Sequence, residues 1–153
     1  PRPLQVPSGL LPVIELDGRV VTESGVIMSL LEEQFPNHNP LMPPAGTPAR
    51  ARADGLMRLE RRLFSDWLNW LCSDRGHERA RQQFEATMDL VAAEMDREGG
   101  PFFLGSSLSL VDITFCPMLE RSAASLAYYK GFYTRGKGRW PAVDRSAGTG
   151  GRA

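Results

Sequence analysis

The spacing of hydrophobic residues predicts a β-hairpin near the start of the chain. A β-prone run at residues 13–16 and a β-branched run at residues 19–22 flank an Asp-Gly dipeptide at 17–18, which is typical of two-residue hairpin turns. Pro12 opens the first run. Because proline has no backbone N–H to donate, we expect it at the first residue or the edge of its strand. The bond that joins it to Leu11 can be cis or trans, and the sequence does not decide between them.

A helix is predicted to follow the hairpin. Four apolar residues recur at helical spacing, namely Val26, Ile27, Leu30 and Leu31. Ser24 or Thr22 is placed to cap the first turn of this helix with its side-chain oxygen. Residues 36–48 then contain five prolines, which neither a helix interior nor a central strand accepts. This segment is therefore predicted to be a linker.

Apolar residues at steps of three and four predict two longer helices, from about residue 49 to 72 and from about residue 78 to 98. The pattern is carried by Leu56, Leu59, Leu63, Trp67 and Trp70 in the first helix and by Phe84, Met88, Val91 and Met95 in the second. A Gly-Gly-Pro run at 99–101 ends the second helix. Residues 146–153 are rich in glycine and show no periodicity, so a disordered tail is predicted there.

Ser109 and Asp112 mark the predicted start of a further helix. They stand at the N-cap and N3 positions of a capping box, with aspartate in place of the usual glutamate. Leu108 and Ile113 occupy the positions of a hydrophobic staple around the same turn. Pro117 lies within this helix and is expected to kink it rather than end it, because the residues after it continue to favour helix.

Composition and charge exclude several functional classes. The 153-residue chain has 18 Lys and Arg against 18 Asp and Glu, so no net field attracts nucleic acid or an anionic membrane. No apolar run approaches the roughly 18 residues of a membrane span, and nothing near the first residue resembles a targeting peptide. Cys72 and Cys116 lack metal-ligand spacing, and His38 and His77 are isolated. We therefore predict free, buried thiols and no metal site; a reactive thiol is the alternative.

The order of these features resembles the cytosolic-type glutathione transferase family: a proline-started hairpin, a "TES" turn opening a helix, a Pro-rich linker and an all-helical remainder. The stretch "FFLGSSLSLVDI" resembles the capping motif at the start of the central helix of that family's helical domain. The stretch "SLVDITFCPMLERSAASLAYYKGF" is similar to a plant and algal subgroup. The resemblance covers residues 6–144. It implies an α/β plus all-α chain, with the C-terminal part of a thioredoxin-like glutathione-binding domain at 1–35, a linker at 36–48, an all-α domain at 49–145 and the tail at 146–153.

The resemblance also implies where glutathione binds. In the family, the residue before a strand-opening cis-proline binds the cysteinyl part of glutathione through its backbone; here these are Leu11 and Pro12. A Glu/Gln-Ser pair at the helix start holds the γ-glutamyl end; here it is Glu23 and Ser24. That end carries an ammonium and a carboxylate, which suit an acidic side chain, a hydroxyl and free helix amides. The alternative is that Ser24 is an ordinary helix cap and Glu23 an ordinary charge near a helix start.

The family fold begins with a β-α-β unit that carries the catalytic Tyr, Ser or Cys, whereas this sequence starts just before the hairpin. We therefore expect either that residues precede Pro1 or that another chain covers the exposed sheet edge. Ser8 is not assigned as the catalytic residue, because it lies four residues before Pro12 in the approach to the strand. The catalytic residue stays unassigned.

Three further features allow two interpretations each. The arginines of residues 50–62 form either a basic patch or a solvated helix face, and the interspersed acidic residues favour the face. Trp67 and Trp70 either line a hydrophobic substrate pocket, which the family builds between its domains, or pack in the core. The stretch "YYKGFYTRGKGRW" at 128–140 suits either stacking on single-stranded nucleic acid or a partner-facing surface, and the neutral net charge favours the latter.

These features together predict glutathione-dependent transfer to a small hydrophobic electrophile, or the related thiol-disulfide chemistry, with glutathione as co-substrate and no metal. Catalysis would consist of lowering the pKa of the bound thiol, because the thiolate is the nucleophile. The alternative is a catalytically silent subunit or scaffold in a larger assembly. The resemblance implies a homodimer or a subunit of a larger complex. The compartment is left open between the cytosol and an organelle interior such as the plastid.

Overall fold

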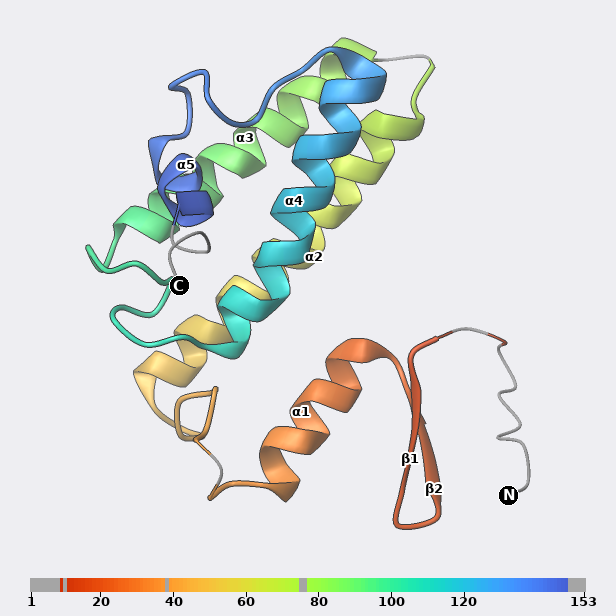
Figure 1. Cartoon of the computed structure of the whole chain (residues 1–153), viewed down its shortest axis with the longest axis vertical. Helices are drawn as coiled ribbons and strands as arrows, with labels where there is room; N and C mark the ends of the chain where they lie inside the picture. The colour runs from red at the N-terminus through yellow and green to blue at the C-terminus, as the bar shows by residue number, and fades with distance from the viewer. Residues whose placement is uncertain (1–8, 10, 38, 75–76, 149–153) are drawn as a thin grey trace. The chain divides into compact units, whose positions relative to one another are not determined.

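The computed structural model describes residue 9 and the ranges 11–37, 39–74 and 77–148. The chain divides into two units, Pro1–Leu41 and Met42–Ala153, and the division falls inside the proline-rich segment predicted to be a linker. Figure 1 shows the described part of the first unit as a hairpin and a helix and that of the second unit as an assembly of helices. Each unit is considered separately.

The first unit contains the predicted hairpin. Strand β1 spans Val13–Leu16 and strand β2 spans Arg19–Thr22, and the two pair antiparallel. Asp17 and Gly18 join them with φ angles of 50° and 74°. A two-residue hairpin turn needs positive φ at both positions, which glycine adopts freely and aspartate tolerates, so the Asp-Gly dipeptide allows this turn.

Helix α1 spans Ser24–Gln34, contacts β2 and buries Ile27. The helix is where the periodicity predicted it, but the predicted cap is wrong. Glu23 occupies the N-cap position, and no side chain makes a capping hydrogen bond there. Ser24 is already the first helical residue, and Thr22 is the last residue of β2, so neither lies at the position from which a side chain can cap.

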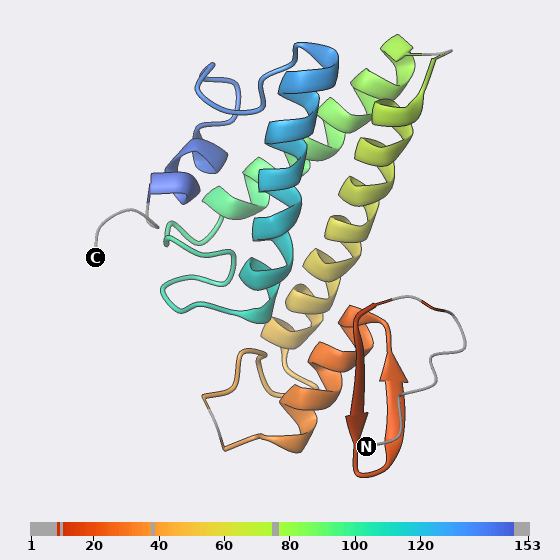
Figure 2. The same cartoon turned by 45° about the vertical axis from the view of Figure 1, so that its right-hand side comes forward.

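The second unit consists of helices α2 (Pro48–Cys72), α3 (His77–Asp96), α4 (Leu110–Lys130) and α5 (Pro141–Gly148). Helix α2 contacts both α3 and α4, and α5 packs against α3, as Figures 1 and 2 show. The observed bounds of α2 and α3 agree with the predicted ones to within two residues. This agreement follows from the strong apolar periodicity of both segments.

Local signals set the ends of these helices. The side chain of Thr47 accepts a hydrogen bond of 3.1 Å from the amide of Arg50, and Pro48 fills the first position of α2, where no amide partner is needed. Helix α4 continues through Pro117, as predicted, and ends at Gly131, which has a left-handed φ of 60°.

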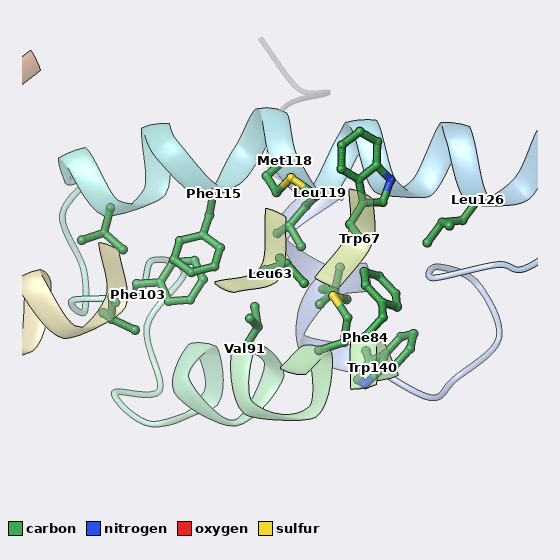
Figure 3. Close-up of a cluster of buried hydrophobic side chains, with 14 of the residues drawn as sticks. Leu63, Trp67, Phe84, Val91, Phe103, Phe115, Met118, Leu119, Leu126 and Trp140 are labelled. Carbon is green, nitrogen blue, oxygen red and sulfur yellow. The ribbon is translucent and has the colours of Figure 1, made fainter. Parts of the chain in front are cut away.

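The core of the second unit lies where α2, α3 and α4 meet (Figure 3). Leu63, Phe84 and Phe115 are fully buried, and Trp140 closes the cluster from the segment just before α5. Phe103 stacks on Phe115 with ring centroids 4.4 Å apart. Burial of each such side chain stabilises the fold by about 1.5–3 kcal/mol, so this contiguous cluster holds the helices together.

Ion pairs occupy much of the arginine-rich face of α2. Arg52 binds Glu94 of α3 at 3.1 Å and also pairs with Glu98, while Arg50 binds Asp54 one turn away at 3.2 Å. The arginines are thus interspersed with carboxylates that neutralise them. This arrangement supports the solvated helix face rather than a basic patch.

Two expectations need correction. Helix α5 continues through Gly148, so the predicted disordered tail is wrong for residues 146–148, and residues 149–153 lie outside the described part. A proline start and the buried Val143 stabilise this last helix despite its glycine-rich end. Cys72 and Cys116 are free but exposed, not buried, because both stand on outward faces of their helices. No helix in the described part is long and apolar enough to cross a membrane.

Candidate functional site

The hairpin register brings together the two residue pairs that the sequence analysis singled out. Val13 and Thr22 are paired at the open end of the ladder, opposite the turn. Leu11–Pro12 directly precedes Val13 in the chain, and the peptide bond between these two residues is cis. Glu23–Ser24 directly follows Thr22. Both pairs therefore lie at the same end of the hairpin, although eleven positions separate Pro12 from Glu23 in the sequence.

All four of these residues are exposed. Leu11 has 87% of its surface accessible, and Pro12, Glu23 and Ser24 are exposed as well. Among the described residues, neither the carboxylate of Glu23 nor the hydroxyl of Ser24 makes a hydrogen bond. An exposed leucine beside polar groups that have no partner in the described part of the chain is a surface that can accept a ligand.

Glu23 has an unusual backbone conformation, with φ 69° and ψ 114°. Positive φ crowds the Cβ of any residue other than glycine, and such strain costs of order 1–3 kcal/mol. Strained residues of this kind cluster at ligand-binding and catalytic positions. The strain therefore singles out one of the residues that sequence resemblance assigned to the site.

The N-terminus of α1 adds hydrogen-bond donors. The first helical hydrogen bond runs from the amide of Ile27 to the carbonyl of Glu23 at 2.9 Å, so the amides of Ser24, Gly25 and Val26 precede it. These amides carry the positive end of the helix dipole and favour a bound carboxylate. The carboxylate of Glu23 beside them favours an ammonium group. This end of the hairpin can therefore bind both charges of a free amino-acid terminus.

The edge of β1 can add backbone hydrogen bonds. Among the described residues, β1 is paired with β2 alone, which leaves its other edge without a strand partner there. An extended peptide can pair with such an edge as an additional strand. The backbone on either side of Pro12 is the part of this edge next to Glu23 and Ser24.

Trp67 and Trp70 both belong to the core of the second unit, with 7% and 1% of their surfaces exposed. The indole N–H of Trp67 donates to the hydroxyl of Ser125 at 2.9 Å, and the ring of Trp70 packs edge-on against Phe132. Both residues thus take the packing role that was the alternative interpretation. A shallow apolar depression runs along α2, and it is lined by Phe64, Ser65, Leu68, Asn69, Cys72 and Ser73 rather than by either tryptophan. A pocket lined by the two tryptophans stays a prediction.

Asp112 confirms the predicted cap of α4 and does more than the sequence indicated. Its carboxylate accepts hydrogen bonds from the amide of Ser109 at 2.8 Å and from the Ser109 hydroxyl. Its second oxygen accepts the amide of Phe103 at 2.9 Å. Leu108 and Ile113, placed as a staple, remain 50% and 39% exposed. Sequence reasoning missed the Phe103 bond, because nothing in the local pattern places that amide beside the helix start.

Two carboxylates of the helical unit have shifted pKa values. Burial raises the pKa of Glu60, and the nearby charges of Arg61 and Arg121 offset only part of that rise. Burial also raises the pKa of Glu85, but the hydrogen bonds from Arg81 and Arg139 outweigh it and lower the pKa below its ordinary value. No group of three or more His, Cys, Asp or Glu among the described residues is arranged to hold a metal ion. Ser8 lies outside the described residues.

Two known protein families match parts of this chain. The family described as "Glutathione S-transferase, N-terminal domain" matches residues 3–40, which include Leu11–Pro12 and Glu23–Ser24. The family described as "Glutathione S-transferase, C-terminal domain" matches residues 74–145. The chain belongs to the glutathione transferase family. Its hairpin and helix are the partial thioredoxin-like domain, and its remainder is the family's helical domain.

Similar glutathione transferases come from plants, fungi and bacteria. The chain is 27% identical over 124 residues to "Glutathione S-transferase DHAR2" of Arabidopsis thaliana, a match that covers 81% of this chain and 54% of the relative. It is 29% identical over 126 residues to "Glutathione S-transferase DHAR3, chloroplastic" of the same plant, covering 81% of this chain and 44% of the relative. The chain thus spans about half the length of these curated relatives.

Solved structures show the same fold. The glutathione transferase Omega 3C of Trametes versicolor superposes with a TM-score of 0.77 at 24% identity, over 95% of this chain and 65% of that one. The bacterial glutathione transferase BphK superposes with a TM-score of 0.68 at 26% identity, over 95% of this chain and 70% of that one. A glutathione transferase of Methylobacterium radiotolerans was solved in complex with glutathione sulfonate, and it superposes with a TM-score of 0.69 at 21% identity.

Proposed function

We propose that this glutathione transferase binds glutathione at the open end of its hairpin and uses it for transfer to a small hydrophobic electrophile, or for the related thiol-disulfide exchange. The observation that carries the proposal is the pairing of Val13 with Thr22, because it holds Leu11–Pro12 and Glu23–Ser24 at one end of the ladder. The plant relatives, named as glutathione S-transferases, support the same assignment.

Glu23 and Ser24 are the residues proposed to bind the γ-glutamyl end. The carboxylate of Glu23 would pair with the ammonium group, while the Ser24 hydroxyl and the first amides of α1 would donate to the carboxylate. The strained backbone of Glu23 supports this role. A conformation that costs stability is retained mainly at ligand-binding and catalytic positions. Among the described residues, none of these groups makes a hydrogen bond that glutathione binding would have to break.

Leu11 and Pro12 are proposed to bind the cysteinyl part of the tripeptide through backbone hydrogen bonds along the edge of β1. This use of the edge is the pairing of an extended peptide with a strand. The tripeptide supplies a thiol that is nucleophilic as the thiolate. The surrounding protein would stabilise this thiolate and exclude water from it. We assign no residue of this chain to the deprotonation itself.

The binding proposal is tested by isothermal titration calorimetry of glutathione with the protein. Ser24→Ala is expected to weaken binding by roughly 1 to 3 kcal/mol, because it removes a hydrogen bond to a charged group. Ser29→Ala is the matched control, since Ser29 is an exposed serine of the same helix whose hydroxyl bonds the carbonyl of Gly25 at 3.0 Å. Equal affinities of the two variants would reject the role of Ser24.

Turnover separates the two functional alternatives. Conjugation of glutathione to a small aryl halide, and reduction of a small disulfide by glutathione, are measured on the same preparation. Turnover in either assay supports the transferase. Binding of glutathione without turnover in both assays would favour the catalytically silent subunit, and absence of binding at millimolar glutathione would overturn the proposed site.

A further inference from the structure

All three tyrosines and both lysines of the chain lie within ten consecutive residues, 128–137. They are Tyr128, Tyr129, Lys130, Tyr133 and Lys137, at the C-terminal end of α4 and in the loop that leads toward α5. We name this set the tyrosine–lysine surface. The sequence has these two residue types nowhere else. Tyrosine is enriched at protein–protein interfaces, so this segment is a candidate interface.

The tyrosine rings are exposed. Tyr128, Tyr129 and Tyr133 have 82%, 69% and 56% of their surfaces accessible. The rings of Tyr128 and Tyr129 meet edge to face with centroids 4.7 Å apart, and the ammonium of Lys137 lies 5.1 Å from the centroid of the Tyr133 ring. Large amphipathic rings exposed side by side expose apolar area that water solvates poorly and a partner can cover.

The loop beneath these rings is anchored to the core. Phe132 points inward and packs against Trp70 with ring centroids 4.9 Å apart, and Thr134 is buried. The indole N–H of Trp140 donates to Asp89 at 2.6 Å, and the amide of Gly136 donates to Asp144 at 2.8 Å. Anchored residues thus flank Tyr133 on both sides. A surface held in this way loses little conformational entropy on binding, which favours affinity.

The segment that carries the surface has charges of only one sign in its own sequence, while carboxylates of neighbouring segments contact it at Arg135, Gly136 and Arg139. Residues 121–143 contain five cationic side chains and no carboxylate. Arg135 is paired with Glu120 at 2.6 Å, and Arg139 with Glu85 at 2.6 Å. Lys130 and Lys137 form no ion pair among the described residues. These two ammonium groups are therefore available to an anionic partner.

We propose that the tyrosine–lysine surface binds an acidic, extended segment of a partner protein. Lys130 and Lys137 would pair with its Asp or Glu side chains, the tyrosine hydroxyls would donate to the same carboxylates, and the ring faces would cover its proline or aromatic residues. Single-stranded nucleic acid fits less well, because a backbone with a charge on every nucleotide is matched by rows of cations. In this segment only Arg121, Lys130 and Lys137 lack an ion pair among the described residues, and Arg121 lies over the ring of Trp67.

Selective isotope labelling tests the proposal on the full chain. Labelling of tyrosine and lysine alone gives NMR signals from the five residues of the tyrosine–lysine surface within this sequence. The probe is the peptide Glu-Pro-Glu-Trp-Glu-Pro-Glu-Trp, and its control is the same peptide with Gln in place of every Glu. We expect the acidic peptide to shift these signals at concentrations up to about 1 mM, and the neutral peptide to bind about tenfold more weakly.

Variants locate the binding. The double substitution Lys130→Glu and Lys137→Glu, and separately Tyr129→Ser with Tyr133→Ser, should each weaken binding by about tenfold or more, whereas Leu90→Ala, at a 47% exposed leucine of α3, should leave it unchanged. Circular dichroism verifies that the variants are folded. The proposal is overturned if the acidic peptide causes no shift, if both double variants bind it as the wild type does, or if an oligothymidylate shifts the same signals at lower concentration than the peptide.

Discussion

The backbone amide of Ser109 donates a hydrogen bond of 2.8 Å to the carboxylate of Asp112, which also accepts the amide of Phe103 at 2.9 Å. One side chain thus accepts a hydrogen bond from the free amide at the start of α4 and another from the preceding loop. Because Phe103 stacks on Phe115 of the same helix, the loop amide and the loop side chain are fixed by one turn of helix. The capping residue is therefore part of the core architecture of the helical unit.

Asp112→Ala is expected to lower the free energy of unfolding by about 2–3 kcal/mol, because two amides and a hydroxyl lose their acceptor. Asp112→Asn keeps one acceptor oxygen, so its free energy of unfolding should lie between those of Asp112→Ala and the wild type. The measurement is chemical denaturation followed by circular dichroism. Glu78→Ala, at an exposed first-turn residue of α3, serves as the control, and a loss no greater than in this control would contradict the role of Asp112.

Glu23→Gly is expected to raise the free energy of unfolding by on the order of 1 kcal/mol and to weaken glutathione binding. Glycine relieves the strain of the positive φ but has more conformational entropy to lose, so only part of the strain energy is recovered. Thermal unfolding and calorimetry measure the two effects. Glu33→Gly, in the last turn of α1, should instead destabilise the protein. If Glu23→Gly destabilises it as well, the strain at residue 23 is not a cost to folding.

Glu60→Gln is expected to stabilise the protein at neutral pH. The pKa of Glu60 is raised in the folded state, so the folded protein binds the proton of this carboxyl group more tightly than the unfolded chain does. Stability is therefore lost as pH rises from the unfolded pKa to the folded pKa of Glu60. The neutral variant escapes that loss. Melting temperatures of variant and wild type should therefore differ at pH 7 and converge below about pH 4, where the unfolded glutamate is protonated too. A difference that is constant with pH would contradict the titration of Glu60.

Glu85→Gln should have the opposite effect. The pKa of Glu85 is lowered in the folded state by hydrogen bonds from Arg81 at 2.8 Å and Arg139 at 2.6 Å, so its charged form stabilises the fold above the unfolded pKa. That contribution is lost as pH falls through the folded pKa. We expect the variant to be less stable than the wild type by roughly 1 kcal/mol at pH 7, with the difference shrinking below about pH 4. The two glutamates thus serve as each other's control in a single pH series.

The sequence by itself determined the elements other than α5 and most of their bounds. An Asp-Gly dipeptide between β-branched runs produced the hairpin, and apolar residues at steps of three and four produced α2 and α3. Ser109 and Asp112 marked the start of α4. Family resemblance pointed to Leu11–Pro12 and Glu23–Ser24. The predicted elements rest on interactions between residues at most a few positions apart, which is why they can be derived from sequence alone, whereas the four site residues were implied by the family resemblance.

The tertiary structure decided what depends on distant partners. Only the ladder register shows that Pro12 and Glu23 lie at one end of the hairpin, and only the backbone shows that Glu23 is strained and that Ser24 does not cap α1. The Trp70 ring lies in the core because α3 and Phe132 cover it, a fact no helical periodicity contains. Packing of segments far apart in the chain sets burial, strain and charge pairing, and these quantities are therefore properties of the folded chain rather than of any stretch of its sequence.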